Sequence, residues 1–298
     1  YQWYAEPYVH NGTLYFAGGR LEEGNVRMDA LFALNMKTHE CEKLEPELTN
    51  YSYVYPARND AWLVYFDSKK DGGGYIRALH QETGVNKIVK EVYVGQPRLH
   101  LSGDILAWME RTGSRMDKLF VADLNTLENV CVKTFNGSAY GQSDISLSNG
   151  ELIFAADGTG DLTPDGKETS AIYSLSVLEG GVAKTVQLST YVHDPVTNGA
   201  DRVWRDGSHG ESDALYWSKN GATAKKLAEN IVDYGLSTSF AAYSQNEAIF
   251  IYVFNDDKTI RITPEGERAQ LLGVSGGAVV WMDVTTRDRE VMKFAQIE

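Results

Sequence analysis

The stretch LFVADLNT, residues 119–126, decides the fold class of this chain. The run from Leu119 to Leu124, suited to a half-buried strand, leads into the turn sequence Asn125-Thr126-Leu127-Glu128. A second apolar run, Val130-Cys131-Val132, follows this turn. This order predicts a β-hairpin. Comparable hairpins are expected where similar apolar runs begin, at Leu31, Tyr75, Ile172, Ala214 and Thr259.

A second kind of apolar run, ending in an aromatic residue, recurs seven times along the chain. Its aromatic residues are Phe16, Tyr65, Trp108, Phe154, Trp204, Tyr252 and Trp281. The intervals are roughly 45 residues, except for the shorter last one, and this period is typical of repeat architectures. Turn signals such as Asn11-Gly12 and Asn149-Gly150 precede most of the runs and favour tight hairpins.

Two hairpins per repeat give four short strands, which is the pattern of a β-propeller blade. We therefore predict an all-β fold, a single β-propeller domain over residues 1–298 with four-stranded antiparallel blades. Seven aromatic strands favour seven blades, and six is the alternative because the last interval is short. The chain stops about two strands short of a full last blade, so residues 2–5 are expected to pair there and close the ring.

The hairpin at residues 119–126 resembles those in the blades of TolB-like and related bacterial β-propellers. The resemblance covers nearly the whole chain and implies architecture alone, since one propeller scaffold hosts many activities.

Composition narrows the function classes. The 298 residues carry 28 Lys and Arg against 41 Asp and Glu, a net charge of -13. Such an acidic chain repels phosphate backbones and anionic lipid, so we expect no nucleic-acid partner. No apolar run is long enough for a transmembrane helix, so no membrane insertion is expected. The chain begins at Tyr1 rather than Met, which suggests a trimmed, exported protein located outside the cell, at its surface or in the periplasm.

Residues 157–168 have oxygen-bearing side chains at the spacing of an EF-hand calcium loop. The candidate ligands are Asp157, Asp161, Asp165 and Glu168. Two features count against calcium, because Leu162 stands where the loop needs Gly and no helical pattern flanks it. A solvated hairpin loop is the alternative. No other cofactor is expected.

Residues 18–30 and 157–171 are the longest expected loops, and loops on a rigid scaffold are common recognition sites. The candidate interaction residues in the first loop are Arg20, Glu22, Glu23, Arg27 and Asp29. A second set, acidic residues near innermost strands, could serve hydrolysis or elimination if paired about 5 to 10 Å apart. These residues are Asp104, Asp144, Asp194, Asp201 and Glu247.

The remaining notable side chains have structural interpretations. Cys41 and Cys131 lie in the first and third repeats, too far apart for a disulfide, and a packing role is expected. Trp108, Trp204 and Trp281 occupy the repeated strand position, which predicts core packing rather than sugar binding.

These observations favour a monomeric, non-enzymatic binding or scaffold module that recognises a protein, peptide or cell-wall glycan through one face. A polysaccharide- or peptide-degrading hydrolase or lyase with acidic residues at a central funnel is the alternative. A cytoplasmic interaction hub is the third hypothesis.

Overall fold

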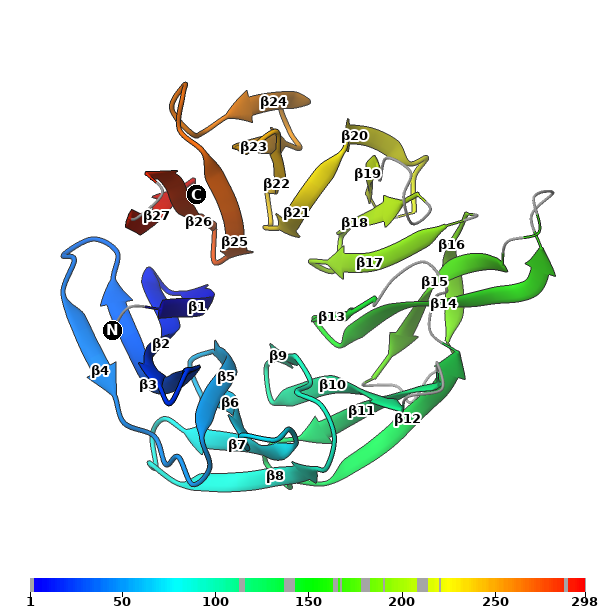
Figure 1. Ribbon diagram of the computed structural model, residues 1–298. Helices are drawn as coiled ribbons and strands as arrows, with labels where there is room; N and C mark the ends of the chain where they lie inside the picture. Colours follow the sequence, from blue (N-terminus) through cyan, green and yellow to red (C-terminus); the bar gives the residue numbers. More distant parts are fainter. Residues whose placement is uncertain are drawn as a thin grey trace. The chain divides into compact units, whose positions relative to one another are not determined.

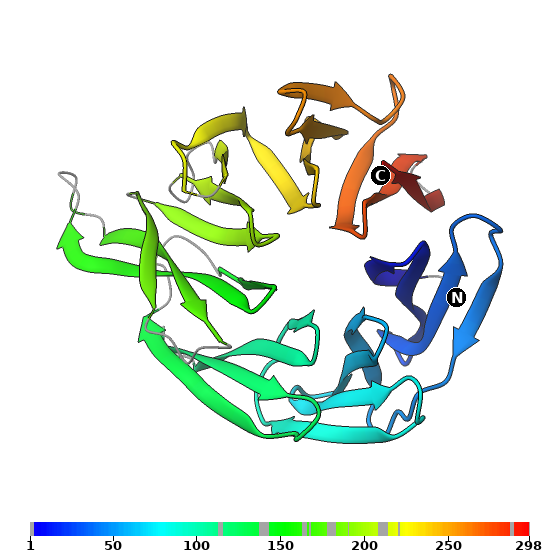
Figure 2. The ribbon, with the colours of Figure 1, turned by 180° about the vertical axis from the view of Figure 1, so that it is seen from behind.

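The computed structural model describes residues 3–112, 116–136, 143–162, 166, 168–177, 183–189, 191–207, 214–219, 221–286 and 289–297. All 27 elements in these ranges are strands, gathered into seven antiparallel sheets whose strands follow chain order (Figure 1). The same sheets are seen from behind in Figure 2. Seven successive sheets of this kind are the blades of a β-propeller, so the predicted all-β fold with seven blades is confirmed, rather than six.

Contacts divide the chain into two compact units. The first unit comprises residues 1–111 and 119–132, and the second comprises residues 112–118 and 133–298. The first sheet contains β1 (Trp3–His10), β2 (Thr13–Glu22), β3 (Asn25–Asn35) and β4 (Cys41–Leu44). The second sheet contains β5 (Ser52–Arg58), β6 (Trp62–Ser68), β7 (Gly74–His80) and β8 (Asn86–Val92). The third contains β9 (Leu99–Ser102), β10 (Ile105–Thr112), β11 (Met116–Asp123) and β12 (Asn129–Asn136).

The second unit holds the other four sheets. The fourth sheet contains β13 (Ile145–Ser148), β14 (Glu151–Leu162), β15 (Glu168–Ser176) and β16 (Lys184–Ser189). The fifth contains β17 (Val192–Thr197), β18 (Asp201–Asp206), β19 (Ala214–Lys219) and β20 (Lys225–Glu229). The sixth contains β21 (Ile231–Leu236), β22 (Phe240–Gln245), β23 (Ala248–Val253) and β24 (Lys258–Arg261). The seventh contains β25 (Ala269–Ser275), β26 (Ala278–Thr286) and β27 (Arg289–Gln296), so it has three strands among the described residues.

The N-terminal strand does not pair as predicted. Trp3 and Ala5 of β1 pair with Gly19 and Ala17 of β2, in the first sheet. The reason is local, because Asn11 and Gly12 both have positive φ and form a two-residue turn that returns the chain onto β1 at little cost in loop closure.

Apolar side chains on both faces of the sheets build the cores. In the first unit, Trp62, Phe66 and Ile76 on one face of the second sheet pack with Leu106 and Trp108 of the third. The other face of the second sheet packs Leu63 and Tyr65 against Ala17 and Leu31 of the first sheet. The second sheet is therefore buried on two faces, with mainly strand ends and turns left for recognition.

A bulge in the first strand of several sheets contains a proline. The pairs Glu6-Pro7, Tyr55-Pro56 and Asp194-Pro195 all fall at register shifts. Proline lacks the N–H that a ladder needs, so an edge strand at a bulge tolerates it. In β5 the extra residue brings Tyr53 and Arg58 onto the same face of the sheet, although they are an odd number of residues apart.

Candidate binding pocket

Four directly paired residues form a row across the second sheet. Arg58 of β5 pairs with Leu63 of β6, Leu63 with Leu79 of β7, and Leu79 with Asn86 of β8. Paired residues on neighbouring strands share a face, so the row presents a base, two leucines and an amide to one side. Neighbouring strands are about 4.8 Å apart, so the row extends over roughly 14 Å.

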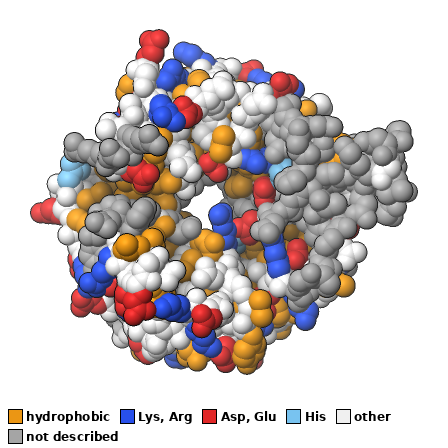
Figure 3. All heavy atoms as spheres, in the orientation of Figure 1, with side chains coloured by type: hydrophobic (Ala, Val, Ile, Leu, Met, Phe, Trp, Pro, Cys, Tyr) orange, Lys and Arg blue, Asp and Glu red, His pale blue; other side chains and the backbone are white. Residues whose placement is uncertain are grey.

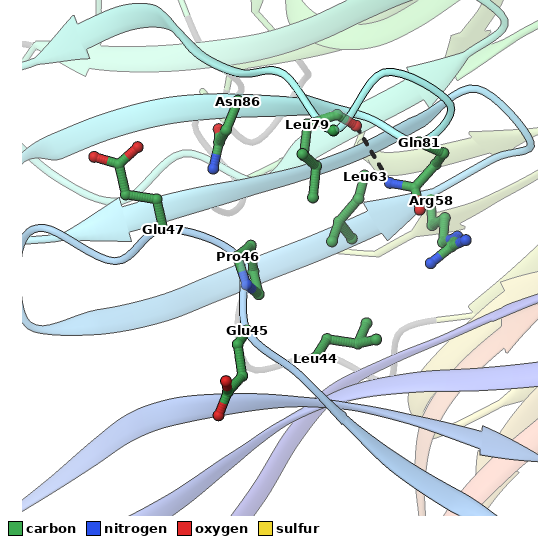
Figure 4. Close-up of a pocket in the computed structure, with 10 residues that line it drawn as sticks. Leu44, Glu45, Pro46, Glu47, Arg58, Leu63, Leu79, Gln81 and Asn86 are labelled. Atoms are coloured by element: carbon green, nitrogen blue, oxygen red, sulfur yellow. Dashed lines mark hydrogen bonds between the residues drawn. The ribbon is translucent and has the colours of Figure 1, made fainter.

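The row forms one wall of a cavity of about 590 Å³. The opposite wall is Leu44, at the end of β4, together with Glu45, Pro46 and Glu47 in the connection to β5. In Figure 4, Arg58 and Gln81 lie at one end, Glu47 and Asn86 at the other, and Leu63 and Leu79 between them. A volume of this size is typical of small-ligand sites in proteins.

A buried ion pair fixes the connection that forms the second wall. Asp67 is fully buried, Arg77 is 3% exposed, and Arg77 Nε donates to Asp67 Oδ2 at 2.9 Å. The Asp67 carboxylate also accepts bonds from the backbone N–H groups of Thr49 and Asn50, at 3.1 and 2.9 Å. Arg77 lies within 3.2 Å of a Glu47 oxygen as well. The connection is therefore held by charge-assisted bonds rather than left as a loose loop.

Two tyrosines tie the same connection to the sheet. Tyr53 Oη donates to the carbonyl of Pro46, and Tyr65 Oη to that of Glu47, each at 2.6 Å. Burial, with the Asp67 charge adding to it, raises the pKa of Tyr53 to about 12. Burial also raises the pKa of Tyr65. Both phenols stay protonated donors at physiological pH, so the wall carrying Pro46 and Glu47 is preorganised.

Two polar groups of the row lack full sets of partners among the described residues. Asn86 Nδ2 donates to Tyr65 Oη at 2.7 Å, whereas Asn86 Oδ1 is buried and accepts no hydrogen bond within the described part of the chain. The Arg58 guanidinium lies 4.9 Å from the centroid of the Tyr15 ring and, among the described residues, has no carboxylate within ion-pair distance. Buried polar atoms without partners cost free energy, so a ligand that satisfies them gains affinity.

The corresponding space between the fifth and sixth sheets is filled. There the row reads Leu236, Ala241, Tyr252 and Thr259. The Tyr252 ring lies 5.6 Å from that of Trp217, and Trp217 stacks on Phe254 at 5.2 Å. Leu79 occupies in the second sheet the place of Tyr252 in the sixth. The cavity therefore depends on Leu79 being smaller than the tyrosine at the equivalent position of the sixth sheet. The repeat alone does not create it.

The candidate interaction residues between residues 18 and 30 lie in a hairpin, not in a loop as predicted. β2 runs to Glu22 and β3 begins at Asn25, leaving only Glu23 and Gly24 in the turn. Their charges are compensated inside the protein. Arg20 pairs with Asp29, Arg27 with Glu22 at 3.0 Å, and Glu23 with Lys70 at 3.2 Å. A role in recognition stays a prediction for Arg20, Glu22, Glu23, Arg27 and Asp29.

The candidate calcium residues also lie in a hairpin for much of their length. Asp157 belongs to β14 and pairs with Ser170, and the backbone of Glu168 begins β15 opposite Leu162. Asp165 and the side chains of Asp161 and Glu168 are outside the described residues. Calcium stays a prediction here, to be checked by comparing thermal melts in calcium and in EDTA.

The carboxylates suggested for a funnel make structural bonds. Asp104 accepts from Trp62 Nε1, and Asp201 from Trp217 Nε1, each at 2.9 Å. The Trp62 bond lowers the pKa of Asp104, and the bond from Arg268 lowers the pKa of Glu247. Oδ1 of Asp194 accepts the backbone N–H of Asp144 at 2.9 Å. The charged forms of Asp104 and Glu247 are therefore stabilised by partners within the chain.

Other predictions have mixed outcomes. Trp108, Trp204 and Trp281 are 0%, 2% and 6% exposed, which confirms their core role. Cys41 and Cys131 are exposed on β4 and β12, so the predicted packing role is wrong. Within the described ranges no group of three or more His, Cys, Asp or Glu could hold a metal, and no helix could span a membrane.

Sequence reasoning missed the row itself. Arg58, Leu63, Leu79 and Asn86 come from four strands, and their alignment depends on register and on the bulge at Tyr55-Pro56. The one sign of the pocket in the sequence is that Leu79 stands where the sixth repeat has the larger Tyr252.

Comparison with known proteins supports the architecture. No family model and no curated protein sequence matches the chain. Among solved structures, the chain is similar to the β-propeller domain of the Trilobed protease from Pyrococcus furiosus, described as having an open velcro topology. The TM-score is 0.73 at 12% identity, over 99% of this chain and 97% of that one.

Two enzymes are similar at the same level of identity. Oligogalacturonate lyase from Vibrio parahaemolyticus has a TM-score of 0.62 at 11% identity, over 100% of this chain and 90% of that one. Pyrococcus horikoshii acylaminoacyl peptidase has a TM-score of 0.67 at 11% identity, over 95% of this chain and 49% of the peptidase. The chain thus spans about half of that peptidase. Identities this low establish the class, a seven-bladed β-propeller, and no activity.

Proposed function

We propose that this protein is a non-enzymatic binding module whose recognition site is the pocket formed by the Arg58, Leu63, Leu79 and Asn86 row. The ligand is a peptide, a segment of a protein or a cell-wall glycan. The observation that carries the proposal is the cavity of about 590 Å³ with its unpartnered Asn86 Oδ1 and unpaired Arg58, both within the described residues. Preformed pockets with an apolar floor and few polar groups are the usual form of a binding site.

One face of the molecule carries charged side chains of both signs. Lys and Arg side chains are interspersed with Asp and Glu over the described part of the face in Figure 3. Such mixing gives no extended basic field, which agrees with the net charge of -13. Nucleic acid is therefore not among the proposed partners.

The setting and the family are proposals of the same kind. We place the module outside the cell, at its surface or in the periplasm, as a monomer, and we relate it to TolB-like propellers through the hairpin at residues 119–126. A lyase or hydrolase is the less favoured function, because Asp104, Asp201 and Glu247 are each engaged by a partner side chain.

Peptide and oligosaccharide arrays probed with the full chain test the proposal. Leu79→Tyr should fill the cavity as Tyr252 fills its counterpart, and should abolish binding of the retained ligand. Val130→Tyr, at a 58% exposed site on β12, is the matched control and should bind as the wild type does. Equal binding by the wild-type protein and the Leu79→Tyr variant would contradict the proposal.

A further inference from the structure

The charges lining the pocket are unequally compensated. Glu45 lies 3.1 Å from Lys43 Nζ, and Glu47 lies 3.2 Å from Arg77. Arg58 contacts the Tyr15 ring but has no acidic partner among the described residues. At the Arg58 end of the cavity, opposite Asn86 (Figure 4), the uncompensated charge is therefore positive, whereas Glu47 at the other end shares Arg77 with Asp67 and adds negative charge there. A guanidinium in such a place suits a carboxylate, which it can bind through two parallel hydrogen bonds.

The rest of the row selects the part of the ligand next to its carboxylate. Leu63 and Leu79 offer an apolar floor beside Arg58, and Asn86 Oδ1 is a buried acceptor at the far end. The ligand must then combine an anionic end, an apolar body and a hydrogen-bond donor within roughly 14 Å. An extended peptide advances about 3.4 Å per residue, so about four residues fit this length.

Resting on the proposed function, we infer that the pocket binds the free C-terminal end of a peptide with apolar final residues. The terminal carboxylate pairs with Arg58, the last side chains lie on Leu63 and Leu79, and a backbone N–H donates to Asn86 Oδ1. A glycan carboxylate lacks the apolar body that the two leucines select, and a fatty acid lacks the N–H donor.

The probe is a pool of hexapeptides with Leu, Val, Phe or Ala at the last three positions, prepared as free acids and as C-terminal amides. The full chain is immobilised, retained peptides are identified, and their dissociation constants are measured by fluorescence anisotropy. The acids should bind about ten- to a hundredfold more tightly than the amides, the range expected for a charge-assisted hydrogen bond.

The variants separate charge from shape. Arg58→Gln should lower the affinity for the free-acid peptides to that for the amides and leave the affinity for the amides unchanged. Arg58→Lys should retain part of the preference for the free acids. Lys87→Gln removes the same charge from an exposed residue next to Asn86 but on the opposite side of the sheet, and should change nothing. Asn86→Leu should weaken the binding of free-acid and amide peptides alike, by several-fold.

Equal affinity for acids and amides, or no effect of Arg58→Gln, would overturn the inference. If Leu79→Tyr still abolished binding in that case, the proposed function would stand while the carboxylate role failed. If Leu79→Tyr left binding unchanged, the pocket would not be the recognition site, and both would fail.

Discussion

Arg77 Nε lies 2.9 Å from Oδ2 of Asp67, and the two side chains are 4% and 0% exposed. Removing one member of such a pair leaves the other charge buried without compensation. Arg77→Met should lower the free energy of unfolding by about 3–5 kcal/mol. Lys87→Met, at an exposed position on β8, should change it by less than about 0.5 kcal/mol. Urea denaturation measures both, and near-equal values would show that the pair does not hold the connection between β4 and β5.

The side chain of Asn59 joins two sheets of the first unit. Its Oδ1 accepts the N–H groups of Ala61 and Trp62 at 3.0 and 2.8 Å, and its Nδ2 donates to the Gly103 carbonyl at 2.7 Å. Asn59→Ala should cost about 1–3 kcal/mol of stability, because two partly buried backbone donors lose their acceptor.

Asn35 provides the control for this prediction. Its Oδ1 accepts the N–H groups of Lys37 and Thr38 in an exposed turn. Asn35→Ala should therefore cost less than Asn59→Ala in the same denaturation experiment. The reverse order would rule out a stabilising role for the bond to Gly103.

The raised pKa of Tyr53 predicts a loss of stability in alkali. The folded-state pKa of about 12 exceeds the ordinary value of 10.0. The contribution of this group is thus fully present below pH 10 and is lost as the pH rises from about 10 to 12. Tyr53→Phe should reduce the slope of stability against pH in this window. Ultraviolet titration should show one late-titrating phenol fewer, and an unchanged titration would contradict the assignment.

Leu79 and Ala78 are adjacent on β7 but face opposite sides of the second sheet. Leu79 lines the cavity, whereas Ala78 is fully buried in the packed core between the second and third sheets. Leu79→Tyr should change stability by less than about 1.5 kcal/mol, because the ring enters open space. Ala78→Tyr should cost about 3 kcal/mol or more through overpacking. Thermal melts compare the two, and equal losses would show that the cavity cannot accept a side chain.

Much of the fold could be predicted from the sequence because each repeat carries local signals. The aromatic strand ends and the Asn-Gly turns act over a few residues, and Trp108, Trp204 and Trp281 recur at the same position of their repeats. The sequence predicts a loop at residues 18–30, where the structure has a hairpin, because the charged side chains there pair across the strands, as Arg27 does with Glu22, instead of facing a core. Strand length there depends on pairing, which composition does not reveal.

The pocket could not be predicted, for a related physical reason. Arg58 lines up with Leu63 only because the bulge at Tyr55-Pro56 shifts β5 by one residue, and a shift of one residue moves every side chain to the other face. Asn86 joins Arg58 on one face of the sheet only in that register. A linear sequence shows neither the burial of Asn86 Oδ1 nor the lack of an acidic partner for Arg58 among the described residues.

The central claim is that ligand recognition takes place at the row of Arg58, Leu63, Leu79 and Asn86. Hydrogen exchange of the full chain, with and without the ligand retained on the arrays, tests it most directly. Added protection should concentrate in residues 44–47 and 79–86, which form the two walls of the cavity. Protection confined to other segments, with these two unchanged, would contradict the account.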